Sequence, residues 1–330
     1  MKDALAIAFP LAQLGVEFFF VISGFLITTL LLKEQAETKT ISLRNFYIRR
    51  LFRIVPVAYL YLIIVLVASL ALNLHPNYFY LGASLLFLRN FFQNSEGINN
   101  LGAHYWSLSV EEQFYLIFPV ILKKWFAFYI FFLCFVIAIS TLSDVVALFM
   151  NPSGEPGKLA FIFLRQFQSI AIGSLFSVYL FKSGLPQTQF IPHQSLVGIV
   201  LFIGILSLCF VRTAFPHFVA LLQSAIFCVI VLLNLRANDS ALFRILNNKY
   251  FKFVGVLSYS IYIWQQPLTL NLTFIDNVRF FKQYQNNLPV HLCISAASVI
   301  LLCAISYLSY FFYERRFLSL KQRFSSMRQQ

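Results

Sequence analysis

Runs of about 20 apolar residues recur along this chain, and they constrain its fold more than any other feature. A helix of that length crosses a hydrocarbon core of about 30 Å and satisfies its own backbone hydrogen bonds in lipid. Nine such runs are flanked by charged residues, prolines or asparagine-rich breaks. They lie near 12–32, 54–74, 105–122, 125–143, 160–181, 195–212, 216–235, 253–272 and 290–312. We therefore predict an all-α, polytopic transmembrane helix bundle that forms one domain over residues 1–330.

The distribution of charge predicts how the bundle is oriented. The net charge is +13, but the basic residues stand mostly in short segments beside the apolar runs, which argues for membrane topology and against a nucleic-acid partner. The segment 33–53 and a basic tail at 313–330 are then cytoplasmic. The run 78–92 is predicted to be re-entrant or interfacial, because another span would move Lys123 and Lys124 outside. This orientation places the N-terminus outside and predicts a missing first helix, which would make ten spans.

Two adjacent glutamates, Glu111 and Glu112, lie inside the stretch "HYWSLSVEEQFYLIFPVIL". An ionisable group within a span is costly and normally faces the bundle interior, so it marks a candidate functional site. On a helix that begins by His104, the spacing puts His104, Ser107 and Glu111 on one face. The carboxylate there can orient an imidazole that takes a proton from a hydroxyl. Alternatively, these residues hydrate near the headgroups or hold neighbouring helices together.

A second polar concentration, "SLRNFYIRRLFRIVP", precedes the second span. Its Arg49, Arg50 and Arg53 are neighbours on a helix at the cytoplasmic mouth. Paired guanidinium groups grip phosphate oxygens well, because each offers planar donors to two oxygens. Basic residues before a span are also common topology determinants and contacts for anionic lipid, so both interpretations stay open.

Four separated stretches resemble the motifs of the acyltransferase family 3 membrane proteins, which include O-antigen and exopolysaccharide O-acetyltransferases. They are "GVEFFFVISGFLIT" (15–28), "FYIRRLFRIVP" (46–56), "HYWSLSVEEQFYLIFP" (104–119) and "VGVLSYSIYIWQQPL" (254–268), followed by "YFFYERRF" (310–317). They occur in the family's order and together span nearly the whole chain. The resemblance implies a bundle of helices, cytoplasmic acyl-CoA as the donor, and an acceptor hydroxyl that is often on a sugar.

The resemblance also assigns roles to residues by position. Arg50 and Arg53 match the family's Arg-x-x-Arg pair, which is associated with the phosphates of CoA, and Arg49 joins this donor site. The positions that match the other motifs, and are expected to form the catalytic and substrate-positioning site, are Trp106, Ser107 and Glu111, with His104 just upstream, and Tyr259, Tyr262 and Pro267. Glu112 is added to His104 and Glu111 as a catalytic candidate.

The chain also departs from the family pattern. The family's first helix normally carries an Arg and a His regarded as the catalytic base, and neither precedes "GVEFFF" here. Glu17 stands where the family usually has Asp, and Gln265 where many members have His. Because Gln cannot take up a proton near neutral pH, Gln265 is predicted to position substrate. His104 with Glu111 is the remaining candidate base. Arg165, inside a span, is expected to pair with one of the glutamates.

The sequence thus predicts a membrane O-acyltransferase that moves an acyl group, expected to be acetyl, from acyl-CoA to a hydroxyl of a cell-surface carbohydrate or similar glycan. Acyl-CoA is a co-substrate, membrane lipid surrounds the chain, and neither a bound cofactor nor a metal is predicted. The expected location is the bacterial inner membrane, with the C-terminus in the cytoplasm. Two alternatives stay open: a transporter or flippase of lipid-linked sugars, and a truncated, catalytically inactive paralogue. No pattern in the sequence indicates the identity of the acceptor or the oligomeric state.

Overall fold

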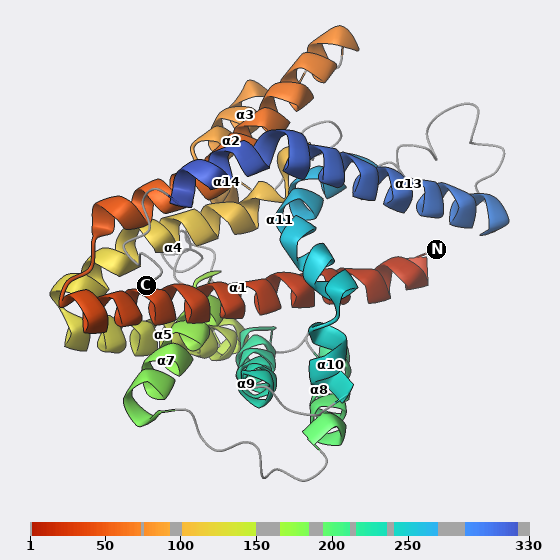
Figure 1. The fold of residues 1–330 in the computed structure, drawn as a ribbon. Helices are drawn as coiled ribbons and strands as arrows, with labels where there is room; N and C mark the ends of the chain where they lie inside the picture. The colour runs from red at the N-terminus through yellow and green to blue at the C-terminus, as the bar shows by residue number, and fades with distance from the viewer. Residues whose placement is uncertain are drawn as a thin grey trace. The chain divides into compact units, whose positions relative to one another are not determined.

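A computed structural model describes residues 2–73, 76–92, 101–149, 166–184, 194–211, 216–235, 241–269 and 288–322. All regular structure within these ranges is helical, as predicted (Figure 1). The chain divides into two compact units, the first made of Met1–Ile41 and Gln113–Asn248, and the second of Ser42–Glu112 and Lys249–Gln330.

The long helices coincide with the predicted spans wherever the described residues cover them. They are α1 (Lys2–Thr38), α2 (Leu43–Ala71), α4 (Tyr105–Lys124), α5 (Phe126–Phe149), α7 (Gln168–Ser183), α8 (Gln194–Val211), α9 (Pro216–Asn234), α11 (Lys249–Thr269) and α13 (Leu288–Leu308). Within the described ranges, four stretches are long and apolar enough to cross a membrane, namely Gln13–Thr38, Leu43–Ala71, Pro216–Asn234 and Leu292–Leu320. Residues 126–142 and 195–209 form shorter apolar helices. The chain is therefore an integral membrane protein, and four of the nine predicted spans meet this stricter criterion.

In the first unit, α1 and α7 pack with their backbones in close contact, side by side in Figure 1. A Cβ atom at Gly24 would overlap the carbonyl oxygen of Ile170, and one at Gly173 would overlap the carbonyl oxygen of Val21. Small residues of this kind let membrane helices approach closely, where packing replaces the hydrophobic drive of water. The hydroxyls of Thr28 and Tyr129, 2.8 Å apart, add a buried hydrogen bond between α1 and α5. The short helix α10 (Ala241–Leu246) completes the unit.

In the second unit, α2 packs against α11 and against the end of the last long helix. That helix continues from α13 through a π-helix, η5 (Ser309–Glu314), into α14 (Arg315–Gln322), so the first part of the predicted tail is helical and residues 323–330 lie outside the described ranges. The segment 78–92 forms α3 (Tyr78–Leu85) and a 3₁₀ turn, η1 (Arg89–Phe91). A helix as short as α3 rises only about 12 Å, so it cannot cross the hydrocarbon core.

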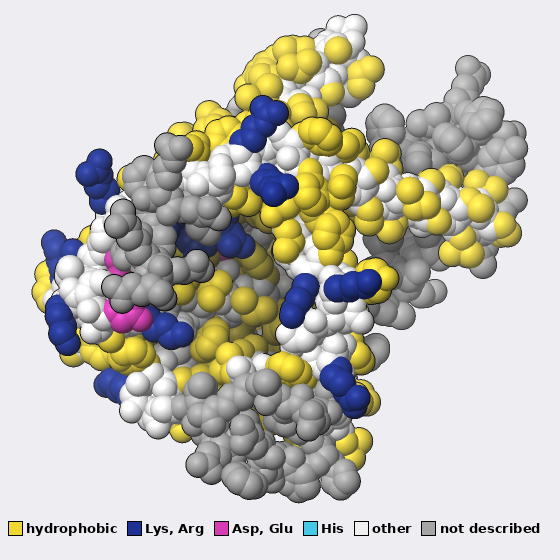
Figure 2. Space-filling view, viewed as in Figure 1, with side chains coloured by type: hydrophobic (Ala, Val, Ile, Leu, Met, Phe, Trp, Pro, Cys, Tyr) yellow, Lys and Arg dark blue, Asp and Glu magenta, His cyan; other side chains and the backbone are white. Residues whose placement is uncertain are grey.

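The surface of the second unit carries apolar side chains along its helices. In Figure 2, yellow hydrophobic side chains cover most of the visible length of α13, and several of its large apolar residues are exposed, among them Leu292, Ile300 and Leu308. A water-soluble helix would place polar groups there. Exposure of such side chains along a helix is what contact with lipid tails requires.

Candidate active site

The start of α4 brings His104, Ser107 and Tyr262 together within the second unit. The helix begins at Tyr105, so His104 directly precedes it, and Ser107 Oγ donates a hydrogen bond to the His104 carbonyl at 3.3 Å. The Tyr262 hydroxyl on α11 donates to the same carbonyl at 2.7 Å, and it accepts in a short hydrogen bond from Ser107 Oγ, which shares its one hydrogen between Tyr262 and the carbonyl. Residues from two motifs far apart in the sequence therefore meet at one point.

Aromatic rings enclose the His104 side chain, which is only 6% exposed. Its ring centroid lies 5.2 Å from that of Tyr61, 4.9 Å from that of Tyr105 and 5.6 Å from that of Tyr262, all in edge-on contacts. The backbone of Ile263 lies close enough to the imidazole for a weak hydrogen-bond interaction, but neither Nδ1 nor Nε2 makes a hydrogen bond of good geometry in the described part of the chain. His104 stands outside the predicted spans, and burial lowers the pKa of its imidazole to about 3, so the ring is neutral at pH 7.

The predicted direct pair between His104 and Glu111 does not form. Glu111 is 4% exposed and interacts electrostatically with Tyr262, so it shares the side of α4 that faces α11. It is nevertheless not a hydrogen-bond partner of His104, because both imidazole nitrogens lack one among the described residues. The physical reason is that α4 starts one residue after His104, which removes the histidine from the helical repeat on which the spacing prediction relied.

The carboxylates gather around Tyr259, whose hydroxyl donates to the Ile54 carbonyl of α2 at 2.8 Å. Tyr259 interacts electrostatically with Glu111, Glu112 and Glu314. Three acidic groups from α4 and η5 thus lie near one tyrosine of the late motif. A membrane protein tolerates such a cluster only where basic or polar partners face it.

The arginines of α2 supply those partners. Arg50, which is half-buried, attracts Glu112, and Arg53, which is exposed, attracts Glu314. Arg49 is half-buried beside them. The predicted phosphate-binding arginines therefore belong to the same unit as these glutamates. Arg50 and Arg53, the two that match the family motif, each lie near a buried or half-buried carboxylate.

The remaining predicted site residues differ in burial and in the unit to which they belong. Trp106 and Gln265 are half-buried on α4 and α11. Glu17 is buried on α1, which belongs to the first unit. Arg165, which was expected to pair with a glutamate, lies outside the described residues.

Glu314 and Trp264 belong to the site although sequence reasoning assigned them no role. Glu314 is 5% exposed, and its Oε1 accepts hydrogen bonds from Ser309 Oγ at 2.9 Å and from Ser260 Oγ. The indole of Trp264 lies 5.5 Å from the ring of Tyr61 between centroids, and its Nε1 has no hydrogen-bond partner among the described residues. Glu314 stood within the quoted stretch "YFFYERRF", which was its only signal. Trp264 likewise stood within the quoted stretch "VGVLSYSIYIWQQPL".

Arg89 is a third residue of this region to which the sequence analysis assigned no role. It is fully buried in η1 and lies 4.6 Å above the ring of Tyr80, and its backbone N–H donates to Ser109 Oγ at 3.1 Å. Burial lowers the pKa of its guanidinium. A charge inside the apolar run 78–92 was the available signal. Its contacts anchor η1 to the start of α4 and so support the turn that presents His104.

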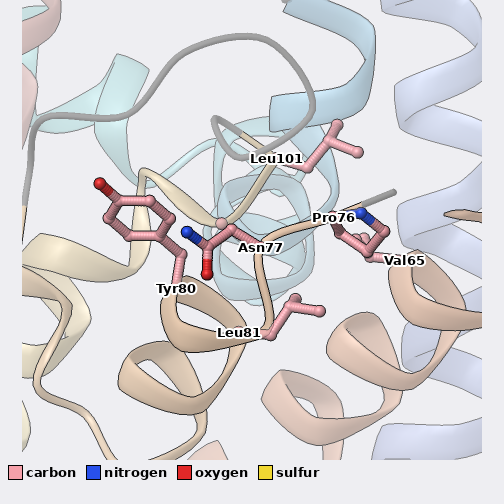
Figure 3. A pocket seen from close by; sticks show the side chains of 7 residues that line it. Val65, Pro76, Asn77, Tyr80, Leu81 and Leu101 are labelled. Atoms are coloured by element: carbon pink, nitrogen blue, oxygen red, sulfur yellow. The ribbon is translucent and has the colours of Figure 1, made fainter. Parts of the chain in front are cut away.

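A small pocket opens beside this support (Figure 3). Its lining is mostly apolar and consists of Val65, Pro76, Asn77, Tyr80, Leu81, Leu101 and Gly102. The Asn77 side chain is already used as a cap, because its Oδ1 accepts from the Phe79 N–H at 3.0 Å. Among the described residues that line this pocket there is no carboxylate, histidine or cysteine.

The assembled groups suit transfer to a hydroxyl. A neutral imidazole has a lone pair that can accept a proton, nearby hydroxyls and an indole N–H can donate hydrogen bonds, and arginines bind anionic oxygens. These groups come from α2, α4 and α11, which tyrosine hydroxyls tie together: Tyr105 donates to the Ala58 carbonyl at 2.6 Å, and Tyr259 donates to that of Ile54. The site is thus built on helices rather than on loops.

Comparison with known proteins agrees with this chemistry. A family model described as an acyltransferase domain matches residues 3–308. The chain is 29% identical over 283 residues to a peptidoglycan O-acetyltransferase, OatA, of Listeria monocytogenes, covering 77% of this chain and 44% of the relative. It is 26% identical over 324 residues to an O-acetyltransferase, OatA, of Staphylococcus aureus, covering 91% of this chain and 52% of the relative. The chain thus spans about half the length of these relatives, and no solved structure matches it.

Proposed function

Because the chain belongs to acyltransferase family 3, we propose that it is a membrane O-acyltransferase that moves an acyl group from acyl-CoA to a hydroxyl of a cell-surface glycan. The observation that carries this proposal is the buried cluster in which His104, whose ring nitrogens have no well-formed hydrogen bond among the described residues, meets Ser107 and Tyr262. Acetyl is the expected acyl group because both relatives are named O-acetyltransferases, and peptidoglycan is the first acceptor to test because the Listeria relative is named for it.

The course of α2 supports acyl-CoA as the donor. Arg50 and Arg53 lie near its start, and Tyr61, which contacts His104, lies a little over two turns beyond Arg53. At the rise of an α-helix this separation is about 12 Å. The pantetheine arm of CoA can cover such a distance, so phosphates held by the arginines would leave the thioester near His104.

In direct transfer, each group has a defined task. His104 accepts the proton of the acceptor hydroxyl, and the resulting alkoxide oxygen attacks the thioester carbonyl carbon. The C–S bond then breaks, and the CoA thiolate leaves with the proton that His104 held. Glu111 interacts electrostatically with Tyr262, whose hydroxyl contacts Ser107 Oγ and the His104 carbonyl, so it places negative charge beside the hydroxyls of the site.

A donor-site test uses the release of free CoA from acetyl-CoA by membranes that contain the protein and a glycan acceptor. Replacing Arg50 and Arg53 with Gln is expected to raise the KM for acetyl-CoA at least about tenfold, because each guanidinium makes charge-assisted hydrogen bonds with phosphate. Membrane insertion should be unchanged. Arg44→Gln is the matched control, since Arg44 is an exposed arginine at the start of the same helix.

Equal donor kinetics in the double variant and in Arg44→Gln would remove Arg50 and Arg53 from the donor site. Lack of CoA release by the wild-type protein, with insertion intact and several glycans supplied, would instead contradict the proposed activity. Movement of a labelled lipid-linked sugar across the membrane under those conditions would favour the transport alternative.

A further inference from the structure

Three buried nitrogen atoms around Tyr61 have no hydrogen-bond partner among the described residues. They are Nδ1 and Nε2 of His104 and Nε1 of Trp264. Both rings contact the ring of Tyr61, at centroid distances of 5.2 and 5.5 Å, and the Trp264 side chain is 9% exposed. All belong to the second unit.

Such atoms are costly to bury. Each unsatisfied polar group costs about 1–3 kcal/mol, and folded proteins keep few of them. The neighbouring hydroxyls do not relieve this cost, because each donates to a backbone carbonyl: Tyr61 to Leu101 at 2.6 Å, Tyr105 to Ala58 at 2.6 Å, and Tyr262 to His104 at 2.7 Å. The fold therefore satisfies its tyrosines and leaves the imidazole and the indole to a ligand.

The chemistry of these nitrogens restricts what the ligand can be. An indole N–H only donates, whereas a neutral imidazole has one donor and one acceptor nitrogen. A matching ligand needs an oxygen that accepts from Trp264 and a hydroxyl that donates to His104. Attack of a hydroxyl on a thioester brings both together, since negative charge develops on the carbonyl oxygen while the hydroxyl loses its proton.

We propose that Trp264 is a catalytic residue whose indole N–H stabilises the oxyanion that forms on the thioester carbonyl. This inference rests on the proposed function and assigns a role to a residue that stands within the stretch "VGVLSYSIYIWQQPL" but was given none from the sequence. The alkoxide oxygen forms the new C–O bond, the carbonyl electron pair moves to the oxygen that faces Nε1, and collapse of this intermediate expels the CoA thiolate. The thiolate takes the proton from His104, which yields an ester and free CoA.

The test replaces Trp264 with benzothienylalanine, which keeps the bicyclic shape but carries sulfur in place of the N–H, and in a second variant with Phe. For both we measure kcat, the KM for acetyl-CoA, and the Kd of an unreactive thioether analogue of acetyl-CoA. The expected result is a fall in kcat of about 100-fold, with KM and Kd unchanged within about twofold, because the bond exists only in the transition state. Trp125→Phe, at a tryptophan that is 57% exposed, is the matched control and should retain full activity.

The possible outcomes separate the two proposals. An active wild-type protein whose kcat survives the benzothienylalanine replacement would overturn the role of Trp264. A loss of affinity for the analogue as large as the loss of kcat/KM would also overturn it, because it would indicate ground-state packing. An analogue that the wild-type protein does not bind, together with no turnover, would overturn the proposed function itself. The benzothienylalanine variant keeps the shape of the side chain, so it tests the role of the N–H even if the Phe variant fails to fold.

Discussion

His104 combines burial with unsatisfied nitrogens, and this combination defines the site at the scale of single residues. Sequence placed His104 in a motif beside two glutamates, which was enough to select it. The absence of a direct bond to Glu111 was not predictable, because it depends on α4 starting at Tyr105 rather than one residue earlier. Trp264 was not predictable either, because its significance comes from an unpartnered nitrogen that only the packing around Tyr61 reveals.

The lowered pKa of His104 predicts how acid affects stability. The pKa of the imidazole is about 3 in the folded protein and about 6.5 in an unfolded chain. As the pH decreases through 6.5, the unfolded state therefore binds more protons than the folded state, and the free energy of unfolding decreases. Between pH 7.5 and pH 5.5 this loss is about 1.4 kcal/mol for the wild-type protein. The His104→Gln variant should lack it, as measured by unfolding in detergent at the two pH values. The same pH dependence in both proteins would contradict the burial of a neutral imidazole.

At the scale of helices, hydropathy predicted where the long elements lie but not how they pack. The spans follow from the length of the apolar runs, since only a helix satisfies its backbone in lipid. The π-helix η5 was not predictable, because its wide turn accompanies contacts of Glu314 with Ser260, which lies on another helix. π-Helical turns within longer helices often occur at functional sites. The motif "GVEFFFVISGFLIT" also has a packing role, because its Gly24 permits the contact between α1 and α7.

That contact predicts position-specific effects of a single methyl group. Gly24→Ala and Gly173→Ala should each destabilise the protein by about 1–3 kcal/mol, because the new Cβ meets a backbone carbonyl that cannot rotate away. Gly204→Ala, in α8, is the control: a Cβ there has nothing within 4 Å, and alanine favours helix by about 1 kcal/mol. Thermal unfolding in detergent would compare the three variants. Equal stability in all of them would argue against the close approach of α1 and α7.

For the whole molecule, the central claim is that groups from two parts of the chain far apart in the sequence form one acyl-transfer site. His104 and Glu111 come from the early part of the second unit, whereas Tyr262, Trp264 and Glu314 come from its late part. These residues are far apart in the sequence, so their proximity could not be predicted from sequence order alone. The resemblance of the separate motifs to one family suggested it. If these residues form the active site, acyl transfer must depend on them.

The most direct measurement follows radiolabel from the acetyl group of acetyl-CoA into an alkali-labile ester on added peptidoglycan or another glycan. Membranes would contain the wild-type protein, His104→Gln or Glu111→Gln, each at equal abundance. We predict labelled ester with the wild-type protein and at least about 100-fold less with His104→Gln, because general acid–base catalysis contributes that much. Glu111→Gln should lower the rate as well, because the negative charge beside Tyr262 is lost. Equal labelling by all three proteins would contradict the placement of the active site at His104.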